Sequence, residues 1–166
     1  MHSTSIERLL ERPDPLMSFR WVSDVPPLGL PYTYVEEVDL PFNNIQVASG
    51  WAGGSGFTYF PSTHDISSFS ITFYEDIHAT TMKWLLKWKS KVKDFSTGLY
   101  GLPDSENGYK QNWTFILTDN KGNPVLRSKM TGMWPAETSN FTLNTESARI
   151  TISQTFSVDG QELQFS

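Results

Sequence analysis

Two stretches of the chain alternate apolar and short hydroxyl side chains with the period of two that is typical of a β-strand. They span 66–74 and 150–158. Their apolar positions are Phe69, Ile71, Phe73, Ile150, Ile152, Phe156 and Val158. Their hydroxyl positions are Ser68, Ser70, Thr72, Thr151, Ser153, Thr155 and Ser157. Because solvated sheet faces usually carry Lys, Glu and Arg, these uncharged faces predict close approach by another surface, or a smooth wall. The pattern favours a protein that builds something over one that turns over a substrate.

The strongest helical pattern covers 78–91, where Met82, Leu85 and Leu86 share one apolar stripe and Trp88 and Val92 lie near its edge. Carboxylates precede this segment at 75 and 76, and lysines occupy its later turns at 83, 87, 89, 91 and 93. This order of charges suits the helix dipole at both ends. The lysines could bind an acidic partner, but a solvated helix face is the favoured interpretation.

Alternating apolar positions also predict strands over 17–22, 32–40, 113–118, 124–133 and 161–165. Trp134-Pro135 is expected to end the fourth of these, and 119–123 has the composition of a hairpin turn. A short helix is predicted over 3–11, in an N-terminal arm over 1–13. The chain, 1–166, is therefore predicted to be a single, mainly β domain. We expect a small antiparallel β-barrel or sandwich with one flanking α-helix and a short N-terminal helix.

An aromatic and glycine-rich segment over 43–65 interrupts the strands. Its candidate contact residues are Gly50, Trp51, Gly53, Gly54, Phe57 and Tyr59. It lacks the Gly-Lys-Ser/Thr ending and the spacing of phosphate loops, so a nucleotide site is not expected. The segment is either a hairpin with a mobile tip or a long loop that becomes ordered on a partner.

The formal net charge of −5 argues against a stably bound nucleic acid, although an acidic wall would help a polyanion to pass without sticking. The chain has no cysteine, so disulfides and thiol chemistry are excluded. No apolar run approaches the ~20 residues of a membrane helix, and the first residues do not resemble a signal peptide. Neither membrane insertion nor secretion through a signal peptide is expected.

The residue pattern offers little to catalysis. His2, His64 and His78 lie far apart and match no metal-ligand spacing, and no nucleophile elbow is present. Adjacent carboxylates such as Glu36 and Glu37 have no apolar surroundings that would separate their pKa values. We therefore expect no catalytic, cofactor-binding or metal-binding residues, no cofactor, and no enzymatic activity.

Three motifs, taken in order, resemble the tail tube proteins of contractile-tailed bacteriophages, whose fold recurs in the type VI secretion inner tube. Arg12-Pro13 lies between the N-terminal helix and the first strand. The run 75–79, Glu-Asp-Ile-His-Ala, follows a strand and opens the helix that bears Trp88. Gly132-Met133-Trp134-Pro135 resembles the family's Gly-x-Trp-Pro. The positions that match the family are thus His78, Trp88, Gly132, Trp134 and Pro135.

The resemblance implies a structural subunit of a phage tail tube, in which hexameric rings stack around a channel for DNA ejection into the host. It implies that subunits pair strand edges to form a continuous inner barrel, and that the 43–65 segment contacts the next ring. The implied partners are copies of the chain, the tail sheath, baseplate or tube-initiator proteins, a tape-measure protein in the lumen, and DNA in transit without specific binding. The implied location is the virion, after assembly in the host cytoplasm.

Three alternatives remain open at this stage. The first is a baseplate or tube-initiator protein that shares the fold but forms a single ring. The second is a monomeric β-sandwich that binds carbohydrate or peptide through Trp51, Tyr59 and Trp113. The third is a small hydrolase that uses Glu36 and Glu37.

Overall fold

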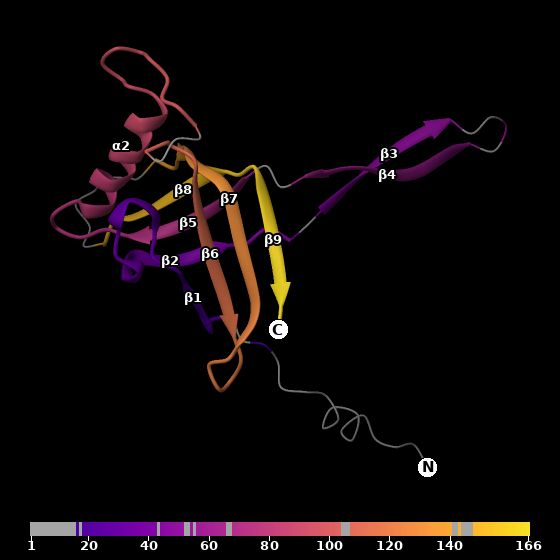
Figure 1. Ribbon diagram of the computed structural model, residues 1–166, viewed down its shortest axis with the longest axis horizontal. Coiled ribbons are helices and arrows are strands. Elements are labelled where there is room, and N and C mark those ends of the chain that lie inside the picture. The colour runs from indigo at the N-terminus through magenta and orange to yellow at the C-terminus, as the bar shows by residue number, and fades with distance from the viewer. Residues whose placement is uncertain are drawn as a thin grey trace.

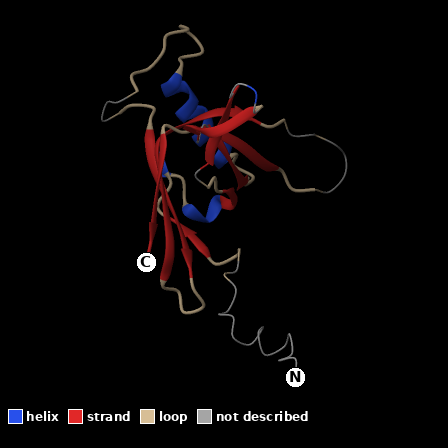
Figure 2. Ribbon diagram, turned by 90° about the vertical axis from the view of Figure 1, so that its right-hand side faces the viewer, coloured by secondary structure: helices blue, strands red, loops and turns tan. Residues whose placement is uncertain are grey.

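The fold is dominated by antiparallel strands that bend around one core, with a helix packed against them (Figures 1 and 2). The computed structural model describes residues 16, 18–42, 44–51, 54, 56–65, 68–103, 107–140, 143 and 148–166. The predicted N-terminal arm, 1–13, and its Arg12-Pro13 motif lie outside these residues. The mainly β class predicted from the sequence is confirmed.

The elements follow the chain in an order close to the predicted one. The strands of the main body are β1 (Trp21–Ser23), β2 (Val35–Asp39), β5 (Ser68–Tyr74), β6 (Gln111–Thr118), β7 (Pro124–Thr138), β8 (Thr151–Ser157) and β9 (Gly160–Phe165). Helix α2 (Thr80–Val92) joins β5 to β6. Two short 3-10 helices, Pro27–Gly29 and Tyr32–Tyr34, precede β2. Strands β3 (Asn44–Trp51) and β4 (Phe57–Asp65) form a separate hairpin.

Strand β7 holds the body together because its two halves belong to two sheets. Its first half pairs with β6 and β9, and its second half pairs with β8. The strand order is β1-β6-β7-β8-β5-β2, with β9 beside β7, and every pairing is antiparallel. The path ends at β1 and β2, which do not pair with each other, so the barrel is open between them.

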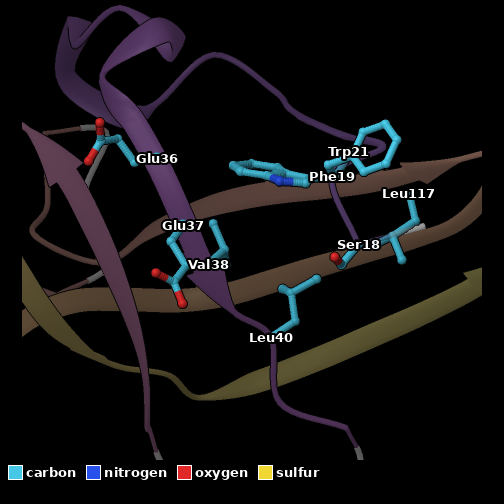
Figure 3. A pocket seen from close by; sticks show the side chains of 8 residues that line it. All are labelled: Ser18, Phe19, Trp21, Glu36, Glu37, Val38, Leu40 and Leu117. Carbon is cyan, nitrogen blue, oxygen red and sulfur yellow. The ribbon is translucent and has the colours of Figure 1, made fainter.

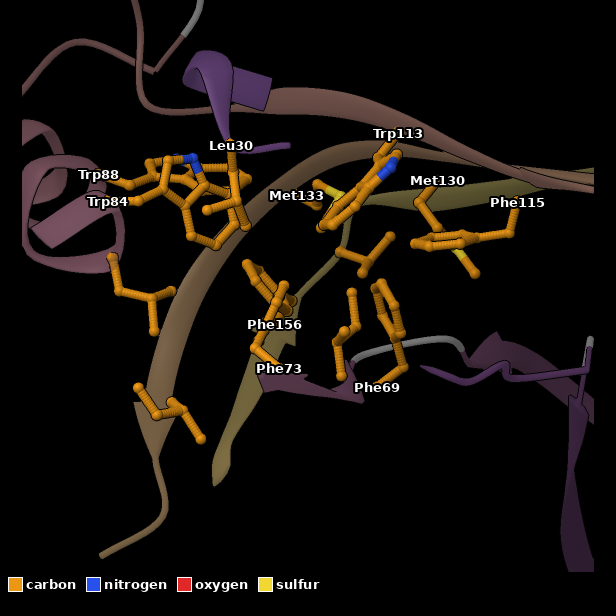
Figure 4. Packing of buried hydrophobic residues seen from close by; sticks show 14 residues of the cluster. Leu30, Phe69, Phe73, Trp84, Trp88, Trp113, Phe115, Met130, Met133 and Phe156 are labelled. Carbon is orange, nitrogen blue, oxygen red and sulfur yellow. The ribbon is translucent and has the colours of Figure 1, made fainter. Parts of the chain in front are cut away.

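The alternating apolar positions predicted for β5 and β8 are buried. Phe69, Ile71 and Phe73 are 5% exposed or less, and Phe156 is fully buried. Helix α2 covers this core, and its Trp88 ring lies 5.5 Å from that of Phe156 (Figure 4). The remaining buried apolar residues are Leu30, Trp84, Leu85, Trp113, Phe115, Met130, Met133, Ile152 and Val158. Seven of the fourteen buried apolar residues are therefore aromatic, and their rings supply large contact areas in the core.

The predicted helix over 78–91 is found as α2, but the prediction of which helix face is buried was wrong. The buried residues of α2 are Thr81, Trp84, Leu85 and Trp88, whereas Leu86 is 60% exposed. Trp88 lies at the centre of the core rather than at the stripe's edge, because the two Trp rings of the helix pack edge-to-face at 5.4 Å. The apolar stripe is therefore centred on the tryptophans, and Leu86 faces outward.

Three predicted strand boundaries were also wrong. Ser18 and Phe19, in the strand predicted over 17–22, lie in a turn, and β1 begins only at Trp21. The segment 32–40 starts as a 3-10 helix and becomes β2 only at Val35. Trp134-Pro135 does not end the preceding strand, since β7 continues to Thr138. Proline is tolerated there because this half of β7 pairs on one side only among the described strands, and proline occurs in sheets at edges.

Candidate assembly surfaces

The hydroxyl residues singled out in the sequence come together on one face of one sheet. Register pairs Ser68 with Ser157, Ser70 with Thr155, and Thr72 with Ser153, so that all lie on the face opposite the core. The hydroxyls of Ser70 and Thr155 are 3.2 Å apart, within hydrogen-bonding distance. Because the side chains at these paired positions are hydroxyls, the face is short and uncharged from Ser68 to Thr72, and Tyr74, paired with Thr151, lies at its end. We call this surface, with Thr151, the hydroxyl face.

Carboxylates flank the hydroxyl face on both sides. Glu37 and Asp39 of β2 pair with Thr72 and Ser70, and Glu137 of β7 pairs with Thr155, so these three acids share the face. At the paired positions that the structure describes on this face, no Lys or Arg occurs. The combination of hydroxyls and carboxylates repels a polyanion and gives it no cation to bind.

The sheet that carries the hydroxyl face has two open edges. Its order is β2-β5-β8 and then the Trp134–Thr138 half of β7, and no other described strand pairs with either outer side. Because all pairings are antiparallel, the strands at the two edges run in opposite directions. The β2 strand of a second copy in the same orientation would therefore extend the sheet at β7 as an antiparallel neighbour. An open edge of this kind invites pairing with another chain.

The predicted loop over 43–65 is a twisted β-hairpin that projects from the body (Figure 1). Gly50 and Trp51 close β3 opposite residues 58 and 57, and Tyr59 pairs with Ser49. Gly53 lies outside the described residues, and Gly54 is exposed. The hairpin form of the prediction is thus the one found, while its predicted role in ring contacts remains a proposal.

The family-like positions are structural. Trp88 is fully buried and its indole N–H donates to the carbonyl of Tyr109 at 2.6 Å. Gly132 has φ +63° at the point where β7 passes from one sheet to the other, and a Cβ there would lie 2.2 Å from Oδ2 of Asp159. Trp134 packs edge-on to Tyr109, with ring centroids 6.1 Å apart, and Pro135 is buried. His78 is exposed in the turn before α2.

Glu75 and Asp76 both cap α2 from outside the helix. Ala79 precedes the helix in the left-handed region and has no capping side chain. Asp76 Oδ1 therefore accepts from the N–H of Thr80, and Glu75 accepts from the N–H groups of Thr81 and Met82. Since the N–H of Lys83 bonds to the carbonyl of Ala79, all four donors of the first turn are satisfied. The sequence predicted that carboxylates at 75 and 76 would favour the start of this helix. It did not predict which backbone N–H groups each carboxylate would accept from.

The Asp76 carboxylate also links α2 to the segment before β2. The hydroxyl of Tyr34 donates to Asp76 Oδ2 at 2.7 Å, and so does the hydroxyl of Thr80 at 2.6 Å. The Thr80 hydroxyl and N–H, followed by the Tyr34 hydroxyl, hold the pKa of Asp76 well below its usual range. In turn the bond to Asp76 raises the pKa of Tyr34. No sequence signal linked Tyr34 to this turn, because the two are brought together only by the β2–β5 pairing.

The pocket that contains both carboxylates of the hydrolase alternative is the slot between β1 and β2 (Figure 3). It has a volume of about 650 Å³ and is lined by Ser18, Phe19, Trp21, Glu36, Glu37, Val38, Leu40 and Leu117. Glu36 forms an ion pair with Arg149 at 2.8 Å, and Figure 3 shows its carboxylate apart from that of Glu37. The two carboxylates do not converge as an acid–base pair requires.

Neither a cluster of metal-binding side chains nor a membrane-spanning helix occurs in the part of the chain that the structure describes. His, Asp and Glu side chains do not gather there in groups of three that could ligate a metal ion. In the same residues we find no helix with the length and apolar character needed to cross a bilayer.

Comparison with known proteins gives matches in structure only. No protein-family model matches the chain, and no curated protein sequence matches it. The cap that terminates the tube of the anti-feeding prophage is similar, with TM-score 0.70 and 11% identity over 93% of this chain and 94% of that one. A chain of the PVC sheath–tube complex, an extracellular contractile injection system, has TM-score 0.67 and 14% identity over 99% of this chain and 100% of its own.

A chain of the PVC sheath/tube terminator is also similar, with TM-score 0.65 and 14% identity over 92% of this chain and 98% of that one. These structures are named as cap, sheath–tube and sheath/tube terminator components. Matches that span nearly the whole of both chains show a common fold from end to end. The chain therefore has the tail tube fold, shared with components of contractile injection systems.

Proposed function

We propose that this protein is the structural subunit of a bacteriophage tail tube. Hexameric rings of it would stack around a channel through which DNA is ejected into the host. The observation that carries the proposal is the hydroxyl face, an uncharged wall with acidic margins on a sheet whose two edges are open and antiparallel to each other. A sheet with these properties closes into a barrel when copies join β2 to β7.

In such a ring the hydroxyl face lines the channel. The opposite face of the sheet is packed against α2 and the core, so only the hydroxyl face is available to a lumen. Short hydroxyls leave the channel wide, and the carboxylates of Glu37, Asp39 and Glu137 keep DNA from adhering. The hydroxyl face would thus let DNA pass through the channel because it does not bind DNA.

The proposal extends to partners and location. The tail sheath would surround the tube, baseplate or tube-initiator proteins would start it, and a tape-measure protein would occupy its lumen. Assembly would take place in the host cytoplasm, and the finished protein would reside in the virion. The likeness to a sheath–tube complex supports a sheath partner as the first to be tested.

Negative-stain electron microscopy of the concentrated protein tests the central claim. We expect rings or tubes with an open centre, whereas a protein that stays monomeric at high concentration, also with a sheath or baseplate partner present, contradicts it. A paired variant tests the wall. Ser70→Lys with Ser153→Lys should give tubes that retain DNA in a filter-binding assay, unlike the unmodified tubes.

The control for the wall is Gln164→Lys with Ser166→Lys, which adds the same two charges at exposed positions on and just after β9, a strand of the other sheet. If this control retains as much DNA as the paired variant, the hydroxyl face does not line the channel.

A second candidate is a single-ring protein that terminates or initiates a tube. The similar cap of the anti-feeding prophage and the PVC sheath/tube terminator favour it. The two candidates differ in length of assembly, because a terminator gives single rings at any concentration and a tube subunit gives polymers. Addition of the protein to growing tubes of a partner separates them further, since only a terminator stops growth.

A further inference from the structure

The open β2 edge of the sheet that carries the hydroxyl face has a fixed order of side-chain directions. Glu37 and Asp39 lie on the hydroxyl face, because they pair with hydroxyl residues of β5. Val35 and Val38 pair with apolar residues of β5 and lie on the core face. Glu36 has no partner in the β2–β5 register, so it is an extra residue that interrupts the alternation.

The open edge of β7 repeats this order in the opposite chain direction. Trp134 and Glu137 pair with hydroxyl residues of β8 and lie on the hydroxyl face. Pro135 and Thr138 pair with buried residues of β8 and lie on the core face. Ala136 has no partner in the β7–β8 register and is again one extra residue. The two edges therefore offer the same number of positions on each face.

One register joins the two edges with every face in agreement. In antiparallel order it sets Asp39 against Trp134, Val38 against Pro135, Glu37 against Glu137, and Val35 against Thr138. The extra residues 36 and 136 then lie on either side of the Glu37–Glu137 pair. A shift by one residue would set hydroxyl-face positions against core-face positions, and a shift by two would lose half of the pairs.

We propose that Glu37 of one copy lies directly opposite Glu137 of the next copy in the ring, and that this like-charged pair makes ring formation depend on protonation. The inference rests on the proposed function and adds to it a register and a means of control. Side chains directly opposite each other in antiparallel strands have Cβ atoms about 4.5–5.5 Å apart, and like charges there are destabilising. The pair exists only between copies, because β5 and β8 separate β2 from β7 within one chain.

The described residues around Glu37 leave its charge without a cation. Its partner on β5 is Thr72, and the β1 side of the neighbouring slot is lined by uncharged residues. Arg149 bonds to both carboxylate oxygens of Glu36, at 2.8 and 3.1 Å, and is thus engaged with the adjacent residue. Asp39 adds a second negative charge to the same face.

Glu137 has similar surroundings. Its partner on β8 is a threonine. Helix α2 brings Lys89 to this end of β7, but the ammonium donates to the hydroxyl of Thr138, which lies on the core face. Tyr109 packs on Trp134 and offers no positive charge. When the two glutamates meet, binding of a proton is therefore the means by which the joint relieves their repulsion.

The direction of the pH effect follows from proton linkage. Because the assembled ring binds protons that the free chain does not, ring formation strengthens as the pH falls from about 7 towards 5 and weakens as it rises again. For one directly opposed pair, the repulsion changes the association constant of a joint by roughly two- to fivefold. Added salt screens the same repulsion and also strengthens assembly at neutral pH.

Sedimentation velocity over a range of concentrations and pH values tests the charge. Glu137→Gln removes the repulsion, so we expect it to form rings at pH 7 at a concentration roughly two- to fivefold lower than the unmodified protein, with a weaker dependence on pH. Glu162→Gln makes the same change at an exposed position on β9, in the other sheet, and should assemble like the unmodified protein. A gain in assembly cannot arise from misfolding.

Charge reversal tests whether the two glutamates face each other. Glu137→Lys should also strengthen ring formation, because the new ammonium pairs with Glu37. The double variant Glu37→Lys with Glu137→Lys brings two like charges together again and should lose this gain.

Cysteine cross-linking tests the register, because the chain has no cysteine of its own. Glu37→Cys with Glu137→Cys should give, on oxidation with diamide, covalent chains longer than a dimer, since directly opposite Cβ atoms lie close to the range of a disulfide. Asp39→Cys with Glu137→Cys places the thiols diagonally, with about 7–8 Å between the positions, and should give few cross-links.

The outcomes separate this inference from the proposed function. If rings form but Glu137→Gln assembles no better than Glu162→Gln, or if the Asp39→Cys pair cross-links in preference to the Glu37→Cys pair, the inference is wrong and the proposed function stands. If the unmodified protein forms no rings at any pH, also with a sheath or baseplate partner present, both are refuted.

Discussion

The capping of α2 by Glu75 gives a prediction whose magnitude follows from the structure. Glu75 Oε1 accepts the N–H of Thr81 at 3.0 Å, and Oε2 accepts the N–H of Met82 at 2.8 Å. Glu75→Ala removes both acceptors, leaving two donors in the first turn of a helix whose Trp88 is in the core. Loss of an ordinary cap costs about 0.5–2 kcal/mol, and loss of a double one belongs in the upper half of that range.

The expected loss of about 1.5 kcal/mol in the free energy of unfolding corresponds to a fall in Tm of roughly 3–6 °C for a domain of this size. Glu75→Gln should cost about half as much, because the amide oxygen still accepts one bond while the charge at the helix start is lost. Urea denaturation followed by tryptophan fluorescence measures both, since Trp84 and Trp88 lie on α2.

The control is Glu37→Ala, which removes an exposed carboxylate from β2 and should change the free energy by less than about 0.5 kcal/mol. If Glu75→Ala is no more costly than this control, the two bonds do not stabilise α2 and the capping argument is wrong.

Three further predictions concern stability. The stability that Asp76 contributes through its lowered pKa is fully present above about pH 4 and is lost as the pH falls further, so Asp76→Asn should flatten the acid limb of a plot of unfolding free energy against pH; an unchanged acid limb contradicts this. Gly132→Ala should cost more than Gly122→Ala, because both glycines have positive φ but only at 132 does the new Cβ meet another side chain; equal losses of Tm would show that the contact relaxes freely. Trp88→Phe should lower the free energy of unfolding by at least about 1 kcal/mol, because it leaves the carbonyl of Tyr109 without its indole donor, and an unchanged urea midpoint would show that water replaces that bond.

The sequence predicted several local features correctly because their causes are local. The alternation in β5 and β8 fixed which side chains are buried, since a strand has a period of two whatever surrounds it. The turn at 119–123 and the acids before α2 were likewise correct, because turn residues and helix ends depend on their immediate neighbours. The 43–65 segment was correctly marked as unusual, although its hairpin form was only one of two possibilities.

Other features depended on partners far along the chain. Spacing placed Leu86 on the helical stripe and Trp88 near its edge, and only the packing of Trp84 and Trp88 against β6 and β8 decided that Trp88 is the buried one. Trp134-Pro135 looked like a strand end, but β8 pairs with that half of β7 and continues it. Neighbours of this kind come from remote segments and leave no local pattern.

The sequence by itself thus determined that the chain is mainly β and that two of its strands have uncharged hydroxyl faces. Only the tertiary structure placed those two strands side by side on one face and left the sheet open at β2 and β7. The reason is that alternation specifies a strand's own two faces, whereas strand order and free edges depend on long-range pairing between segments up to about a hundred residues apart.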